Sequence, residues 1–146
     1  MFNKRQINFA TLFGLGFLTK FPGTLASFFT LIIAYIIIVK TNFLFYIIVL
    51  GFLIIVGYFS TSKYITYKIK DDPSEVVIDE AIGQLISSFF LPYFIFKNKF
   101  IFETFDILIY LIMSFIFFRF FDIIKPFPVS YFDKNFKNYF GIIMDD

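Results

Sequence analysis

Residues 21–39 read FPGTLASFFTLIIAYIIIV, and residues 41–62 read TNFLFYIIVLGFLIIVGYFSTS. Neither stretch contains a charged side chain, and only Lys40 separates them. Each is about as long as the roughly 20 residues that an α-helix needs to cross the hydrocarbon core of a bilayer. The two stretches therefore predict two consecutive membrane-spanning helices.

Two later apolar stretches are shorter. Residues 81–96 contain four residues that are unusual in a lipid-facing helix: Gln84, Ser87, Ser88 and Pro92. They predict a span that faces protein or is kinked. Residues 107–118 are extended by phenylalanines on both sides, which predicts a tilted or partly embedded helix.

The N-terminal apolar stretch, residues 7–19, is short and broken by Gly14 and Gly16. These properties favour an interfacial or re-entrant element. A signal peptide is the alternative, because Lys4 and Arg5 precede the stretch, but Lys20 interrupts the pattern that such a peptide requires. We expect an uncleaved element.

The composition agrees with a membrane protein. Of the 146 residues, 59% are hydrophobic, and the mean hydropathy is +0.81, whereas a soluble domain is about 45–50% apolar. We expect an all-α, polytopic membrane helical bundle with about four membrane-embedded helices and a single domain over residues 1–146. The net charge is only +2 and no basic stripe is present, so nucleic acid is not an expected partner.

The chain contains no Cys, His or Trp. Disulfides, thiolate zinc sites, Cys nucleophiles, His bases and Ser-His-Asp triads are therefore excluded. Any catalysis must use carboxylates, Lys, Arg, hydroxyl groups and metal-bound water.

Ionisable residues gather in three places at the edges of apolar segments. Asp79 and Glu80 head one apolar run, a second group lies at residues 119–125, and Asp145 and Asp146 end the chain. Charge beside lipid is costly and indicates function by default. We interpret the three groups as one metal and phosphate site. The alternatives are an interfacial acid pair, a structural ion pair between Arg119 and Asp122, and a solvated tail.

Two further segments have helix-start patterns. Asp72-Pro73-Ser74-Glu75 predicts a capped helix beginning at Pro73. Lys20 to Ser27 combines turn residues, a cation and two hydroxyl groups at the start of the first span, where free backbone N–H groups can face an anion. An ordinary turn is the alternative for this second segment.

The distribution of basic residues predicts the topology. Ten of the 13 Lys and Arg residues precede the first span, lie between the second and third spans, or follow the last span. Since basic loops stay in the cytoplasm, we expect the three groups of ionisable residues on the cytoplasmic side.

Four motifs carry a resemblance to a known family. They are Pro22-Gly23-Thr24-Leu25-Ala26-Ser27, Val77-Ile78-Asp79-Glu80-Ala81-Ile82-Gly83-Gln84, residues 118–128 (FRFFDIIKPFP) and Gly141-Ile142-Ile143-Met144-Asp145-Asp146. Together they resemble the phosphatidylglycerophosphatase A family. The resemblance implies a multi-pass enzyme of the bacterial inner membrane that uses Mg²⁺ to hydrolyse the phospholipid phosphatidylglycerophosphate to phosphatidylglycerol and inorganic phosphate.

The resemblance and the preference of Mg²⁺ for oxygen ligands suggest roles for the site residues. Asp79, Glu80 and Asp146 are the expected metal ligands, while Asp122 and Asp145 are further ligands or position the attacking water. The expected substrate-binding residues are Lys20, Thr24, Ser27, Arg119 and Lys125.

Other functions fit less well. A CDP-alcohol phosphatidyltransferase would need an Asp-Gly and Ala-Arg signature that is absent, and a PAP2-type phosphatase would need His. A small membrane cation-binding or transport subunit stays open as the alternative, because acidic residues could line a path for the ion.

Overall fold

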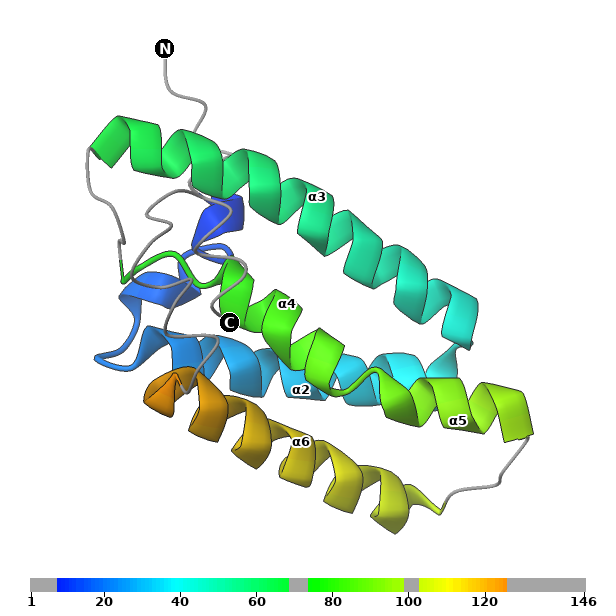
Figure 1. Ribbon diagram of the computed structural model, residues 1–146. Helices are drawn as coiled ribbons and strands as arrows, with labels where there is room; N and C mark the ends of the chain where they lie inside the picture. The colour runs from blue at the N-terminus through cyan, green and yellow to red at the C-terminus, as the bar shows by residue number, and fades with distance from the viewer. Residues whose placement is uncertain (1–7, 69–73, 99–102, 126–146) are drawn as a thin grey trace.

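The computed structural model describes residues 8–68, 74–98 and 103–125. In this part of the chain the elements are the 3₁₀ helix η1 (Leu15–Phe17) and the α-helices α2 (Pro22–Lys40), α3 (Phe43–Lys68), α4 (Ile78–Ser87), α5 (Phe90–Asn98) and α6 (Thr104–Ile124). Figure 1 shows α2, α3 and α6 as long helices around the shorter α4. The all-α prediction is confirmed.

Three helices are long and apolar enough to cross a membrane: Pro22–Lys40, Phe43–Tyr64 and Thr104–Ile124. No more than a third of the residues in each span are buried inside the protein, so most of their apolar side chains face outward, as lipid-facing side chains do. The two uncharged stretches are thus helices, and the phenylalanines around residues 107–118 do extend the last one.

The predicted kinked span consists of two helices, α4 and α5, separated at Ser88 and Phe89. Pro92 explains the break, because proline cannot donate a backbone hydrogen bond and its ring collides with the carbonyl group four residues earlier, here that of Ser88. The chain therefore leaves the axis of α4 before α5 begins.

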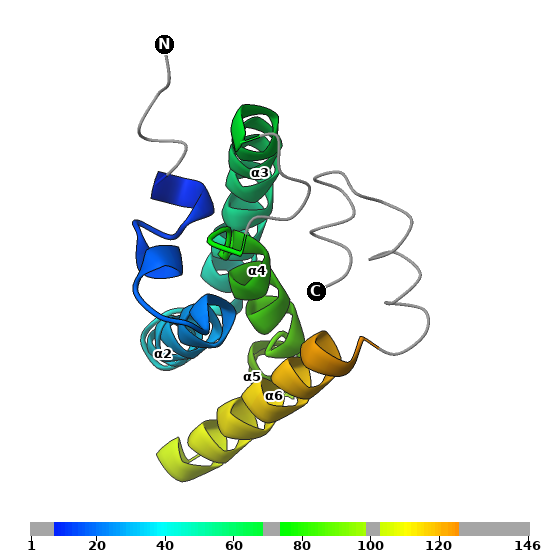
Figure 2. The same ribbon diagram turned by 90° about the vertical axis from the view of Figure 1, so that its left-hand side faces the viewer.

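Helix α4 is the centre of the bundle. It contacts α2, α3 and α6, and Figure 2 shows it between these helices in a second view. Gly57 of α3 makes the close approach possible, since a Cβ atom there would lie 2.9 Å from the Cδ1 atom of Ile82. The Tyr46 hydroxyl also donates a 2.7 Å hydrogen bond to the backbone carbonyl group of Leu85.

The N-terminal element covers the loop that leads into α4. The backbone N–H of Val77 donates a 3.0 Å hydrogen bond to the carbonyl oxygen of Ala10. Between Ala10 and Gly16 the chain turns at Gly14, which has φ of 96°. Gly16 lies so close to the backbone of Glu75 that a Cβ atom would overlap its carbonyl oxygen. This short element therefore fixes where α4 starts.

The sequence predicted that a helix starts at residues 72–75. This prediction is wrong for Ser74 and Glu75, the two of these residues that the structure describes. Ser74 and Glu75 form a turn, and α4 begins at Ile78 after Val77, which provides no side-chain cap. Glu75 has another partner, because its Oε1 atom accepts a 3.0 Å hydrogen bond from the Tyr64 hydroxyl. A long-range contact thus replaces the expected local cap.

Replacement of Gly16 tests this packing. Because the overlapping atom is a backbone oxygen, Gly16→Ala should lower the free energy of unfolding by about 1–3 kcal/mol. A Cβ atom at Gly51 on α3 would meet nothing within 4 Å, so the control Gly51→Ala should raise it by up to about 1 kcal/mol. Thermal unfolding in detergent measures both, and equal effects would contradict the close contact.

Candidate active site

Three helix ends meet at one end of the bundle. In Figure 1 the start of α2, the start of α4 and the end of α6 lie at the same end of the molecule. The contacts of α4 with both α2 and α6 agree with this arrangement. The site residues that the sequence predicted on these three helices are thereby brought close together.

Asp79 and Glu80 occupy the first turn of α4. The partial positive charge of a helix N-terminus favours carboxylates there. Asp79 is 7% exposed, and the carboxylate of Glu80 lies directly against Gly23 of α2, where a Cβ atom would overlap its Oε1 atom. A larger residue at position 23 would therefore displace the carboxylate.

The surroundings of Glu80 disfavour its negative charge. Burial raises the pKa of Glu80, a side-chain hydrogen bond with Asp79 lowers it, and the charge of Asp122 raises it while that of Arg119 lowers it. The net result is a pKa above the usual value for glutamate. Within the described residues, the buried Oε2 atom of Glu80 has no hydrogen-bond partner. Such a carboxylate gains from the approach of a cation.

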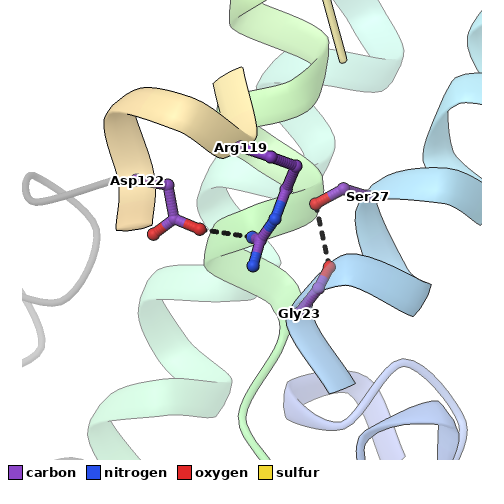
Figure 3. A network of polar contacts seen from close by, with 4 residues as sticks. All are labelled: Gly23, Ser27, Arg119 and Asp122. Atoms are coloured by element: carbon purple, nitrogen blue, oxygen red, sulfur yellow. Dashed lines mark hydrogen bonds and ion pairs between the residues drawn. The ribbon is translucent and has the colours of Figure 1, made fainter. Parts of the chain in front are cut away.

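Arg119 and Asp122 form an ion pair on the last turns of α6, with side chains 16% and 12% exposed. The structural pair that the sequence left as an alternative is therefore present. Figure 3 shows the Arg119 side chain extending from α6 toward Gly23 and Ser27 at the start of α2. Its buried Nε atom has no hydrogen-bond partner among the residues that the structure covers, so the guanidinium group keeps a donor for a ligand.

The other predicted substrate-binding residues differ in their placement. Ser27 is buried, and its hydroxyl donates a 2.9 Å hydrogen bond to the carbonyl oxygen of Gly23. Thr24 is partly buried in the first turn of α2, whereas Lys20 precedes that helix and is exposed. Lys125 caps α6 with φ of 45°, in agreement with the helix end that Pro126 predicts.

The structure describes only some of the predicted metal ligands. Asp145 and Asp146 lie outside the described residues. Within residues 8–68, 74–98 and 103–125, no group of three or more acidic residues is arranged to hold a metal ion. Apart from Glu75, which bonds to Tyr64, the described carboxylates at this end of the bundle are those of Asp79, Glu80 and Asp122.

A second polar cluster lies deeper in the bundle and was not predicted. Gln84 is fully buried, and its Nε2 atom lies 3.4 Å from Ser87 Oγ, 3.2 Å from Ser88 Oγ and 3.3 Å from Ser114 Oγ. The signal in the sequence was the polar content of residues 81–96, which indicated contact with protein. It did not identify Ser114 of α6 as the partner.

A cavity of about 200 Å³ lies at the opposite end of the bundle, where α2 ends, α3 begins and α5 passes. Its lining includes Thr41, Asn42, Phe43 and Pro92 and contains no acidic residue. The cavity is therefore separate from the carboxylates and has no group suited to phosphate chemistry.

Comparison with known proteins agrees with the motifs. The profile of the family described as phosphatidylglycerophosphatase A matches residues 8–146. A relative named phosphatidylglycerophosphatase A from Haemophilus influenzae is 29% identical over 134 residues, which cover 92% of this chain and 75% of the relative. No solved structure matches the chain. Since the family profile spans nearly the whole chain, including the segments of α2, α4 and α6 that form the site, the chain belongs to the phosphatidylglycerophosphatase A family.

Proposed function

We propose that this protein is a Mg²⁺-dependent lipid phosphatase that hydrolyses phosphatidylglycerophosphate to phosphatidylglycerol and inorganic phosphate. Family membership supports the substrate. The observation that carries the chemistry is the pairing of unused polar atoms at one site: the Oε2 atom of Glu80 and the Nε atom of Arg119 are both buried without a hydrogen-bond partner among the described residues. One suits a cation and the other a phosphate oxygen.

The donor set fits Mg²⁺. This ion takes one or two protein carboxylates and completes its shell with water and substrate phosphate. Asp79 and Glu80 would hold it from the first turn of α4, with Asp146 as a further ligand. When bound, Mg²⁺ would polarise the phosphoryl group and offset its negative charge.

Arg119 binds the phosphoryl oxygens and stabilises the charge that they carry in the transition state. Asp122 holds the guanidinium group through the ion pair on α6 and so limits the rotamers that Arg119 can adopt. Lys125, one residue after α6 ends, adds a second positive charge. Asp122 and Asp145 are also the groups that we assign to positioning the attacking water.

The position of the site suits a lipid substrate. It lies where three apolar helices end, so that a headgroup phosphate can reach the carboxylates while the acyl chains stay in the bilayer. The excess of basic residues in the loops on this side supports a cytoplasmic orientation of the site. We therefore propose an active site at the cytoplasmic face of the bacterial inner membrane.

A cation-transport subunit is less consistent with the geometry. An ion path needs charge near the middle of the membrane. The described acidic residues near the spans lie instead at or beside helix ends. Glu75, Asp79, Glu80 and Asp122 lie at one end of the bundle, and Glu103 and Asp106 lie at the start of α6. This distribution favours the phosphatase.

Phosphate release from phosphatidylglycerophosphate in detergent tests the proposed function. The parent protein should release phosphate with Mg²⁺ and stop when the ion is chelated. Asp79→Asn and Glu80→Gln should each lower kcat by about 100-fold or more, because an electrostatic contact to the reacting group is lost. Glu103→Gln, at the exposed start of α6, is the matched control and should retain full activity. A folded parent without activity, or variants as active as the parent, would refute the proposal.

Arg119 variants test phosphate binding separately. Arg119→Lys keeps the charge and the ion pair with Asp122 but loses the fork of donors, so kcat/KM should fall by about 10-fold. Arg119→Gln should lower kcat/KM by about 100- to 1,000-fold. Lys97→Gln, an exposed change on α5, should have no effect. Activity of Arg119→Gln at the parent level would exclude this role.

A further inference from the structure

The interface between α4 and α6 contains a polar cluster to which the proposed phosphate chemistry gives no role: Gln84, Ser87, Ser88 and Ser114. Gln84 and Ser88 are fully buried, whereas Ser87 and Ser114 are partly exposed. The cluster therefore reaches from the middle of the bundle to its surface.

The serine hydroxyl groups fix the orientation of the Gln84 amide. Ser87 and Ser88 each donate a 2.9 Å hydrogen bond to the backbone carbonyl oxygen of Gln84, and Ser114 donates one of 2.9 Å to that of Leu111. Ser88 Oγ and Ser114 Oγ also lie 3.0 Å apart, so one of these two hydroxyl groups can donate to the other instead. In either case each serine proton has an acceptor other than Gln84, and the serine oxygens are left to accept from Nε2. Exchanging the amide nitrogen and oxygen would place Oε1 against three oxygens whose protons are directed elsewhere.

The Oε1 atom of Gln84 therefore points away from the serines. It is buried, and no hydrogen-bond donor meets it in the described part of the chain. Leaving such an acceptor without a partner is unfavourable, because no hydrogen bond offsets the loss of its hydration. Like Glu80 Oε2 and Arg119 Nε, it is a buried polar atom that can bind a ligand. Unlike Glu80, it is uncharged and suits a hydroxyl donor.

The positions of these atoms match the order of groups in the proposed substrate. Gln84 lies one helical turn, or about 6 Å, beyond Glu80 on α4, and Ser114 lies about 7.5 Å before Arg119 on α6. Because α4 and α6 run in opposite directions (Figure 1), both steps lead away from the helix ends. In phosphatidylglycerophosphate, a glycerol with one free hydroxyl follows the terminal phosphate on the way to the acyl chains.

We propose that Gln84 Oε1 accepts a hydrogen bond from the free hydroxyl of the headgroup glycerol, so that Gln84 selects the glycerol phosphate headgroup. This inference rests on the proposed function, because it places the terminal phosphate between Glu80 and Arg119. Gln84 then determines substrate specificity without taking part in the cleavage of the phosphate ester.

The test compares two substrates with the purified protein and Mg²⁺. One is phosphatidylglycerophosphate, and the other is the same lipid with propane-1,3-diol in place of the headgroup glycerol, which replaces only the free hydroxyl by hydrogen. The parent should prefer the first by about 100-fold in kcat/KM, since a site built around a substrate hydroxyl rejects the analogue without it. Gln84→Met, similar in volume, should bring the two kcat/KM values together by lowering the first.

A matched control separates recognition from packing. Ser114→Ala removes one acceptor of Nε2 but leaves Oε1, so it should retain the preference for the hydroxylated lipid. Equal kcat/KM values in the parent, or a Gln84→Met variant that keeps the parent's preference, would overturn the inference while leaving the proposed function intact. If Gln84→Met does not fold, the ratio for the parent decides alone. Failure of the parent to hydrolyse either lipid would refute the proposed function itself.

Discussion

The contact between Gly23 of α2 and the carboxylate of Glu80 of α4 is the constraint on which the rest of the site depends. Because no side chain occupies position 23, the Glu80 carboxylate fits between the two helices. Burial there raises its pKa, and the charges of Arg119 and Asp122 act on it from α6. One missing Cβ atom thus allows a carboxylate, a guanidinium group and a helix N-terminus to share a small volume at the membrane edge.

The surrounding helices explain why this short helix keeps its place. Lipid tails are as apolar as the side chains of the spans, so the hydrophobic effect alone does not hold helices together in a bilayer, and close packing and hydrogen bonds must do so. Here Gly57 brings α3 against α4, while Tyr46 and Gln84 bond across the interfaces. Polar residues are concentrated on α4 because it is the helix that three others shield from lipid.

The sequence predicted the parts that hydropathy and local chemistry determine. The uncharged stretches gave the limits of the spans closely, Pro92 indicated the break before α5, and Pro126 indicated the end of α6. Tertiary contacts account for the rest. Glu75 was interpreted as a helix cap but bonds to Tyr64. Gly23 beside Glu80 and Ser114 beside Gln84 come from other helices, which a one-dimensional pattern does not specify. The expected roles of Asp145 and Asp146 remain predictions, since both lie outside the described residues.

A double-mutant cycle between positions 23 and 80 tests the central contact most directly, with phosphate release from phosphatidylglycerophosphate as the measurement. Gly23→Ala should lower kcat by about 100-fold, because a shift of about 1 Å in a site residue has an effect of this size. Glu80→Asp shortens the side chain by one methylene group and makes room for the new methyl group. The account predicts that the double variant is no less active than Glu80→Asp alone. Losses that multiply in the double variant, or full activity of Gly23→Ala, would contradict it.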